Sequence, residues 1–367
     1  MCASHEELFS LLKRLCEAWG PPGREDSVRE IVIDELRNYV DEIHVDSLGN
    51  VIAVKRGGRG GAKLVLAAHM DEVGFVVSHI DDKGFLRVLP VGGLHERNVI
   101  SQRIAIRTRD GRIVRGVVGA KPPHVAKPEE ARQVPEFREL FVDIGASSRE
   151  EVEKLGVRVG DFAVFDRDLQ LLGTKRVTGK ALDDRVGLAV MISVVKELEK
   201  HEVDLYAVAT VQEEVGLKGA RVAAYAIDPD AAIALDVTIA LDVPGVGEHE
   251  YVTRLGRGPA IKVIDGRMGT GLIANPKLFN KLIEIAEKHG IPYQVEVAPG
   301  GTTDASAINL TKRGVPAVTV SIPTRYLHSS VEVLDLDDVV NAVKLVKRFI
   351  EEVPSEWLAS LRGYRAK

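Results

Sequence analysis

The chain has 367 residues, with 49 Lys and Arg against 54 Asp and Glu, which gives a formal net charge of −5. This length is sufficient for two domains, or for one large domain with an insertion, and for a core that needs no disulfides. The basic residues are scattered and no apolar run reaches membrane-spanning length, so we expect neither a nucleic-acid partner nor a membrane span.

Cysteine and amide usage indicate the cellular setting. Cys2 and Cys16 are the two cysteines, and neither has a metal-ligand spacing or a candidate ligand nearby, which fits a reducing cytoplasm. The first residues, M-C-A-S-H-E-E, do not have the basic and apolar segments of a signal peptide, so we expect a cytoplasmic protein. Charged residues make up 28% of the chain against five Gln and seven Asn, a balance that favours a thermophilic source.

The first 71 residues predict the beginning of an α/β domain. Apolar residues at helical spacing predict helices over residues 6–19 and about 24–40, separated by the turn G-P-P-G. Strands are expected over residues 43–45 and 50–54. The small and aliphatic residues at 64–68 predict a strand buried on both faces, which stops at His69.

Residues 72–173 have a different pattern. Short β-rich runs at 74–80, 85–89, 103–108 and 113–118 are separated by D-K-G, G-G and D-G turns. Helical periodicity is almost absent before residues 148–154. We therefore expect a small β-barrel or sandwich inserted into the α/β domain over residues 72–173.

From residue 174 to residue 367 helices and strands alternate again. Helices are expected over residues 185–200, 218–225, 276–289, 304–312 and 336–352. Strands are expected over residues 205–211, 231–235, 293–297 and 315–321. This alternation predicts a mostly parallel central sheet with helices on both faces, which completes the α/β domain begun by residues 1–71.

Acidic and histidine side chains follow the buried strands. In chain order, the residues at these strand ends are His69 and Asp71, then Gln212, Glu213 and Glu214, then Asp236, and finally His328 after a short loop. Asp183 and Asp184 lie at the start of the helix that opens the second half of the domain. Because a parallel sheet places its strand ends at one edge, we expect these side chains to converge.

Three carboxylates and two imidazoles at one edge suit two divalent ions that share an aspartate. One ion would take His69, Asp183 and Asp236, and the other would take Asp183, Glu214 and His328. Nitrogen and oxygen ligands without thiolate suit zinc, cobalt or manganese. We expect two divalent ions in each subunit, with Zn²⁺ favoured and Co²⁺ or Mn²⁺ as alternatives.

Glu213 and Asp71 have supporting roles in this hypothesis. Glu213 is adjacent to a ligand but is not needed as one, so we expect it to be the general base, provided that the chain turns just after Val211. Asp71 is expected to hold the imidazole of His69 in one tautomer. Each of these residues alone could be a cap or a satisfied polar group, and Asp183 could simply cap its helix. Their equivalent topological positions favour the metal site.

The segment A-P-G-G-T-T-D-A has two interpretations. Thr303 and Asp304 have the residue types of a helix N-cap. The functional alternative is that Gly301, Thr303 and Asp304 form a substrate-binding wall beside the metals. Both interpretations stay open on the sequence.

Six motifs in this order resemble the tetrahedral (TET) aminopeptidases, dinuclear metallo-exopeptidases of the zinc aminopeptidase superfamily. The motifs are A-H-M-D-E-V-G at 68–74, A-L-D-D-R at 181–185, V-Q-E-E-V-G at 211–216, L-D-V at 235–237, G-G-T-T-D-A at 300–305 and R-Y-L-H-S at 325–329. The resemblance extends over nearly the whole chain and implies a zinc-exopeptidase-like fold with the ligands, base and orienting aspartate given above. It also implies an inserted dimerisation domain and assembly of dimers into a hollow tetrahedral dodecamer. Thr302 and Ser306 depart from the pattern, since glycine is common at both positions.

The expected reaction is removal of the N-terminal residue from short peptides by a metal-bridging hydroxide, with Glu213 as general base and a preference for neutral or aliphatic first residues. A carboxypeptidase or deacylase of the same superfamily is an alternative, because the ligands do not show which end of the substrate is held. A glycosidase with Glu213 and Glu214 as its acid pair is less favoured, because adjacent residues cannot easily flank a sugar and aromatic content is only 5%. A scaffold with structural metal leaves Glu213 unexplained.

Overall fold

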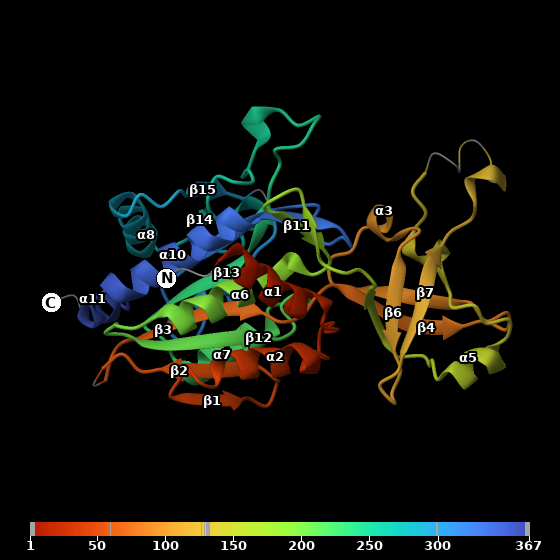
Figure 1. The fold of residues 1–367 in the computed structure, drawn as a ribbon, viewed down its shortest axis with the longest axis horizontal. Helices are drawn as coiled ribbons and strands as arrows, with labels where there is room; N and C mark the ends of the chain where they lie inside the picture. Colours follow the sequence, from red (N-terminus) through yellow and green to blue (C-terminus); the bar gives the residue numbers. More distant parts are fainter. Residues whose placement is uncertain are drawn as a thin grey trace.

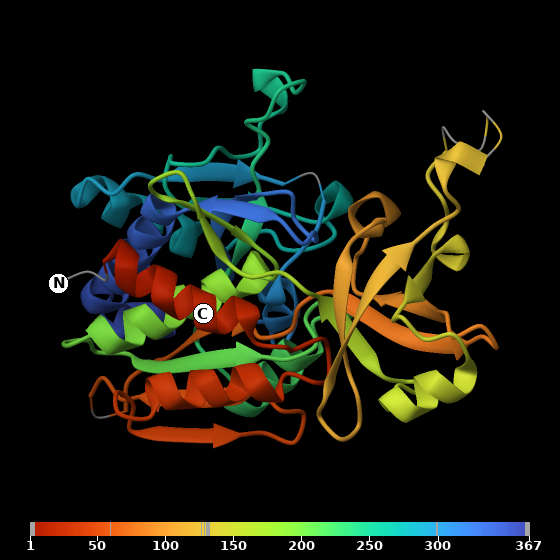
Figure 2. The same cartoon turned by 45° about the vertical axis from the view of Figure 1, so that its right-hand side comes forward.

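A computed structural model describes residues 4–363 of the chain, apart from residues 59, 126, 128, 130–132 and 299. Cys2 therefore lies outside the described residues. An α/β body and a smaller β-barrel lie side by side as two lobes (Figure 1), and the turned view keeps them apart (Figure 2). Within the described residues, the helices are too short or too polar to cross a membrane.

The α/β body is built on an eleven-stranded mixed sheet. Nine strands lie in the order β1 (Glu42–Val45), β2 (Val51–Lys55), β12 (Asp204–Thr210), β3 (Lys63–His69), β13 (Ala231–Ile239), β16 (Ala317–Arg325), β17 (Glu332–Asp335), β11 (Arg176–Gly179) and β10 (Gln170–Leu172). β14 (Ala260–Ile264) pairs with β16 and with β15 (Gln294–Val297). The strands from β12 to β16 in this order run parallel, whereas the strands on either side of them pair antiparallel. The predicted parallel sheet is therefore the centre of a mixed sheet.

Helices cover both faces of this sheet, as the alternation of elements predicted. One apolar core holds side chains of α1 (His5–Glu17), α2 (Asp26–Leu36), α6 (Leu182–Glu197), α8 (Pro276–Lys288), α10 (Leu336–Glu352) and α11 (Ser355–Ser360). A second core, on the other face, holds those of α7 (Lys218–Ile227) and α9 (Asp304–Asn309). Alternate residues of the central strands contribute to the two cores, so these strands are buried on both faces.

The second lobe is a closed six-stranded barrel. Its strands lie in the order β4 (Gly74–Ile80), β5 (Leu86–Val91), β8 (Phe141–Asp143), β7 (Ile113–Gly119), β6 (Arg103–Arg107) and β9 (Phe162–Phe165). The short helices α3 (Glu96–Val99) and α5 (Arg149–Leu155) accompany them. The barrel thus lies within the predicted insertion, although residues 170–172 already pair with the large sheet as β10.

One strand boundary differs from the expectation in a way that affects the site. β13 does not end at Leu235 but continues to Ile239, because β16 extends beside it as far as Thr324. The pairing of β13 with β3 stops earlier, where Ala234 lies opposite Ala67. Asp236 is therefore inside a strand, at the point where that strand diverges from β3.

Candidate metal centre

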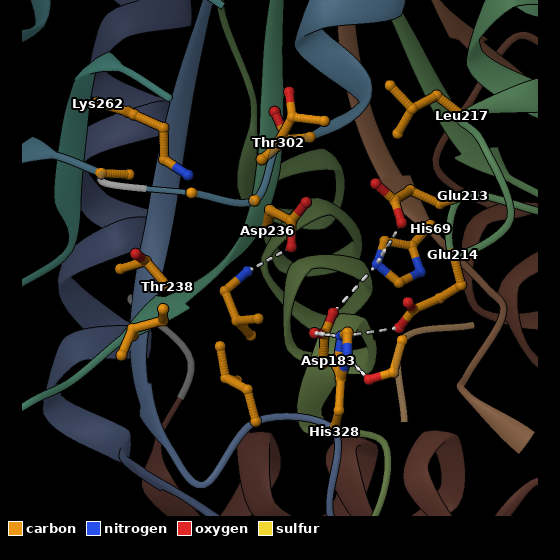
Figure 3. A pocket seen from close by; sticks show the side chains of 18 of the residues that line it. His69, Asp183, Glu213, Glu214, Leu217, Asp236, Thr238, Lys262, Thr302 and His328 are labelled. Carbon is orange, nitrogen blue, oxygen red and sulfur yellow. Dashed lines mark hydrogen bonds and ion pairs between the residues drawn. The ribbon is translucent and has the colours of Figure 1, made fainter. Parts of the chain in front are cut away.

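The five side chains predicted as metal ligands lie together at one edge of the central sheet (Figure 3). They line a cavity of about 630 Å³ together with Glu213. They come from five separate segments: His69 ends β3, Asp183 lies in the first turn of α6, Glu214 follows β12, Asp236 lies in β13, and His328 follows β16.

Asp183 lies at the centre of this group. Its Oδ1 is 3.1 Å from Nε2 of His69, and its Oδ2 is 3.2 Å from Nε2 of His328. Oε1 of Glu214 lies 3.3 Å from the same nitrogen of His328. The two oxygens of Asp183 thus face two different imidazoles, which is the arrangement that a bridging carboxylate requires.

Asp184 is a further acidic neighbour that the strand-end argument did not select as a ligand. Two groups of three potential ligands have their atoms within 4.8 Å of one another: His69 with Asp183 and Glu214, and His69 with Asp184 and Asp236. The carboxylate of Asp184 accepts the backbone N–H of His69 at 3.2 Å and that of Gly187 at 3.0 Å. Each oxygen of Asp184 thus holds one backbone group, while its carboxylate also lies within reach of His69 and Asp236.

The chain turns directly after β12, at Gln212, where φ is +55°. This turn lets the neighbouring side chains of Glu213 and Glu214 both reach the cavity. Asp71 holds the turn, since its Oδ1 accepts the backbone N–H of Glu213 at 3.0 Å and its Oδ2 accepts that of Glu214 at 3.1 Å. Oε2 of Glu213 lies 4.0 Å from Nε2 of His69.

The contact between Asp71 and His69 differs in detail from the expectation. Nδ1 of His69 lies 3.1 Å from the backbone oxygen of Asp71, and 3.6 Å from its carboxylate. Donation from Nδ1 to the carbonyl leaves Nε2, which faces Asp183, as the nitrogen available to a metal. The backbone of Asp71 therefore orients the imidazole, while its carboxylate holds the two glutamates.

The carboxylates of the cavity are crowded and buried. Burial raises the pKa of Glu214 and of Asp236, and the negative charge of Asp183 raises both further. Asp183 behaves differently, because the neighbouring His328 and His69 lower its pKa by more than burial raises it. Negative charges held close together in a buried space favour the binding of cations.

These residues fit divalent cations in two respects. The donor set is imidazole nitrogen and carboxylate oxygen without thiolate, which suits Zn²⁺, Co²⁺ or Mn²⁺. In addition, Oε1 of Glu214 is buried and accepts no hydrogen bond from any residue that the structure describes. Buried polar atoms usually have a hydrogen-bond partner, so a carboxylate oxygen without one in this position is consistent with a metal ligand.

Two of the three residues predicted to form a substrate wall line the cavity. Gly301 and Thr303 line the cavity. Thr303 also caps α9, because its Oγ1 accepts the backbone N–H of Ala305 at 3.3 Å. Asp304 is not among the lining residues: its side chain is buried, and Oδ2 accepts a hydrogen bond from Oγ1 of Thr210 at 2.5 Å. Asp304 therefore lies behind the wall.

Three residues of the site were not identified from the sequence: Glu332, Lys262 and Glu296. Glu332 is buried at the start of β17 and contacts the backbone of two predicted ligands. Lys262 and Glu296 lie inside β14 and β15 and line the cavity. None of the three follows a buried strand, so an argument based on strand ends could not find them.

Comparisons with known proteins find relatives over nearly the whole chain. The family model of the M42 glutamyl aminopeptidases matches residues 49–345. The lysyl aminopeptidase of Pyrococcus furiosus is 42% identical over 349 residues, which cover 94% of this chain and 97% of that protein. Aminopeptidase APDkam598 of Desulfurococcus kamchatkensis has a TM-score of 0.96 and 56% identity, and the match covers 99% of each chain. The TET1 peptidase of Pyrococcus horikoshii, which can assemble into a tetrahedron or a large octahedral shell, has a TM-score of 0.82 and 36% identity over 94% of this chain and 100% of that chain.

Proposed function

The chain belongs to the M42 glutamyl aminopeptidase family, and on this premise we propose that it removes the N-terminal residue of short peptides with Glu213 as the general base. Membership of this family makes the protein a hydrolase of the aminopeptidase type, as its sequence motifs predicted. The observation that supports the finer proposal is that Glu213 shares one cavity with all five potential metal ligands.

In this proposal two divalent ions, Zn²⁺ or alternatively Co²⁺ or Mn²⁺, are held by His69, Asp183, Glu214, Asp236 and His328. Bound there, the ions would supply Lewis-acid activation of a water molecule and of the scissile carbonyl. Asp183 would contribute a ligand to both ions, because its two oxygens face His69 and His328 separately.

The side chains around the ions have separate roles. Glu213 takes the proton of the attacking water and passes it to the leaving amine. Asp71 keeps the backbone of Glu213 and Glu214 in place through two hydrogen bonds. Gly301 and Thr303 form part of the wall that the substrate contacts, and Asp304 supports this wall from behind.

The role of Glu213 can be tested with the variant Glu213→Gln. Glutamine keeps the shape of the side chain but cannot take a proton, so turnover should fall by roughly 10²- to 10⁴-fold while two ions stay bound. Metal content by mass spectrometry and turnover of leucyl p-nitroanilide measure the two quantities on the same sample. Turnover near that of the wild type would refute the role.

The end of the substrate that is held can be tested with blocked and unblocked compounds. Each aminoacyl p-nitroanilide is assayed beside its N-acetylated form, after chelation and re-addition of Zn²⁺, Co²⁺ or Mn²⁺. We expect cleavage of the unblocked compounds only, with a preference for neutral or aliphatic first residues, and only with metal. Cleavage of the blocked forms alone would overturn the aminopeptidase proposal, and full activity without metal would refute the metal-dependent mechanism.

We also propose that residues 72–173 mediate dimerisation and that dimers assemble into a tetrahedral dodecamer in the cytoplasm. Assembly of the related TET1 peptidase into closed shells supports this proposal. The separate barrel lobe offers a surface for the dimer contact (Figure 1). Light scattering after size exclusion should give twelve times the chain mass of 40.0 kDa, and a monomer mass would overturn the proposal.

A further inference from the structure

An ion pair lies in the wall of the cavity, away from the potential metal ligands. Lys262 on β14 and Glu296 on β15 are register partners, and Nζ of Lys262 lies 3.4 Å from Oε1 of Glu296. Both side chains are buried, at 5% and 0% exposure, and both line the cavity. In Figure 3 the side chain of Lys262 points into the cavity, and Asp236 lies between it and His69.

The polar atoms of this pair are incompletely satisfied. Oε1 of Glu296 accepts a hydrogen bond from Oγ1 of Thr238 at 2.5 Å. Oε2 of Glu296 is buried and has no hydrogen-bond partner among the described residues. A buried ion pair with an unused oxygen is costly as a structural device, because desolvation of the two charges is not fully compensated. Because the pair lies in the wall of the cavity, a role in substrate binding explains its presence better than a role in stabilising the fold.

The position of the pair relates it to the substrate. Thr238 lies two residues after Asp236 on β13, so both side chains point to the same face of the sheet. For a peptide whose amino end lies beside Asp236, Thr238 and the ion pair are therefore the neighbouring groups on the same face of the sheet. The lining of the cavity also includes the apolar residues Val252, Ala298 and Leu327.

A third charged group contacts the lysine from outside the cavity. Oδ2 of Asp265 lies 3.8 Å from Nζ of Lys262, and Asp265 is not one of the residues that line the cavity. Its Oδ1 accepts hydrogen bonds from the backbone N–H of Leu272 at 2.5 Å and from Oγ1 of Thr302 at 3.1 Å. Asp265 therefore supports Lys262 from behind, whereas the ammonium group of Lys262 and the carboxylate of Glu296 belong to residues that line the cavity.

We propose that the Lys262–Glu296 ion pair closes the pocket for the first side chain of the substrate and selects neutral residues by presenting two opposite charges together. This inference rests on the aminopeptidase function proposed above. A basic first residue is attracted by Glu296 but repelled by Lys262, and an acidic one meets the reverse. A neutral apolar side chain leaves the pair intact and packs on the apolar wall, so it binds without separating the two charges.

The test removes one charge at a time and measures kcat/KM for leucyl, lysyl and glutamyl p-nitroanilides. Lys262→Met removes the positive charge and keeps Glu296 as the charge of the pair. It should raise the lysyl-to-leucyl ratio of kcat/KM about 10-fold or more, a range typical of single charge contacts. Glu296→Gln removes the negative charge and keeps Lys262 as the charge of the pair. It should raise the glutamyl-to-leucyl ratio of kcat/KM by a similar factor. Lys262→Arg keeps the charge and should keep the wild-type ratios.

A matched control is Lys347→Met. Nζ of Lys347 also lies 3.4 Å from a glutamate oxygen, that of Glu197, but this pair joins α10 to α6 away from the cavity. The control should leave all three ratios unchanged. If Lys262→Met fails to fold, the kcat/KM ratios of Glu296→Gln and Lys262→Arg still test the role of the ion pair.

The outcomes separate the inference from the function on which it rests. Ratios that stay constant in the folded variants, or a wild-type enzyme that prefers lysyl or glutamyl substrates, would overturn the role of the ion pair while leaving the aminopeptidase function standing. A wild-type protein that releases no first residue from any of the three unblocked substrates would instead refute the proposed function. Opposite shifts of the two ratios support the inference.

Discussion

Oε2 of Glu332 accepts a hydrogen bond from the backbone N–H of Asp183 at 3.1 Å. Its other oxygen, Oε1, accepts the backbone N–H of His328 at 2.8 Å. One buried carboxylate on β17 thus fixes the backbone of two proposed ligands that approach the cavity from different segments. Outer groups of this kind set the position of metal ligands and hence the affinity for the metal.

The variant Glu332→Gln should weaken metal binding. Glutamine has a single acceptor oxygen, so its NH₂ group would face the N–H of either Asp183 or His328 and break one of the two hydrogen bonds. We expect the affinity for Co²⁺ to fall by roughly 10- to 100-fold. Titration of the metal-free protein with Co²⁺, followed by visible absorption, measures this affinity without any assay of activity.

Asp338 provides a matched control for this substitution. Its Oδ2 accepts the backbone N–H of Gly256 at 2.7 Å and its Oδ1 accepts that of Gly258 at 2.7 Å, away from the residues that line the cavity. Asp338→Asn removes the same kind of double contact and should lower stability without changing the affinity for Co²⁺. Equal losses of Co²⁺ affinity in the two variants would show that Glu332 acts only through general stability.

The variant Asp71→Asn should reduce turnover. The carboxylate of Asp71 holds the backbone N–H groups of Glu213 and Glu214, and asparagine can accept from only one of them. We expect kcat to fall by roughly 10- to 100-fold with a smaller change in KM, because a misplaced base and ligand affect the transition state more than substrate binding. Steady-state kinetics on leucyl p-nitroanilide measure both constants.

A control for Asp71 is found in the barrel. Oδ1 of Asp81 accepts the backbone N–H groups of Lys83 and Phe85, each at 2.9 Å, in the turn between β4 and β5. Asp81→Asn should leave kcat unchanged. A kcat for Asp71→Asn equal to that of the wild type would mean that the two glutamates keep their positions without this carboxylate.

The sequence indicated the candidate ligands because of their place in the fold. His69 and Glu214 lie at or just beyond the ends of buried strands, and the parallel centre of the sheet brings these ends together. The turn required after Val211 is present at Gln212. The positions of His69 and Glu214 could be predicted because they depend on strand order and periodicity, which the pattern of apolar residues reveals.

The rest of the site depends on contacts between distant residues. Glu332 lies 149 positions after Asp183, and nothing in its local sequence indicates that its carboxylate meets the backbone of Asp183. Asp236 was expected beyond a strand end but lies inside β13, because the length of β13 follows from its pairing with β16 rather than from its own residues. Lys262 and Glu296 became neighbours only through the register of β14 and β15.

Asp338 should make stability depend on pH. Burial raises its pKa from 3.8 to about 6. Because the folded state holds this proton more tightly than the unfolded chain, stability decreases as the pH rises from about 4 to about 6. A shift of about two pKa units corresponds to at most about 3 kcal/mol.

The variant Asp338→Asn isolates this effect, because asparagine does not titrate. The difference in free energy of unfolding between wild type and variant should shrink as the pH rises from 4 to 7, since the contribution of the Asp338 carboxyl is lost over that range in the wild type alone. Urea denaturation in the presence of a chelator, at several pH values, measures the difference. A difference that stays constant with pH would mean that the pKa of Asp338 in the folded protein is close to its ordinary value.

Gly219 couples the packing of α7 to the position of the glutamates. A Cβ added at this residue would lie 2.5 Å from the backbone nitrogen and 2.5 Å from the backbone oxygen of Val211, and 2.3 Å from Oδ1 of Asn50. Asn50 itself holds the two segments together, since it accepts the N–H of Val211 at 3.0 Å and donates to the oxygen of Gly219 at 3.0 Å. The start of α7 can therefore move only if the end of β12 moves as well.

We expect Gly219→Ala to be destabilised by about 1–3 kcal/mol, the usual cost of overpacking. Because the displaced backbone leads directly into Glu213 and Glu214, kcat should fall at temperatures at which the variant is fully folded. Gly58→Ala is the control, since no atom lies within 4 Å of a Cβ at that position. Chemical denaturation of both variants measures the loss of stability, and steady-state kinetics measure the change in kcat. A Gly219→Ala protein with reduced stability but normal kcat would show that the turn at Gln212 is held by Asp71 independently of α7.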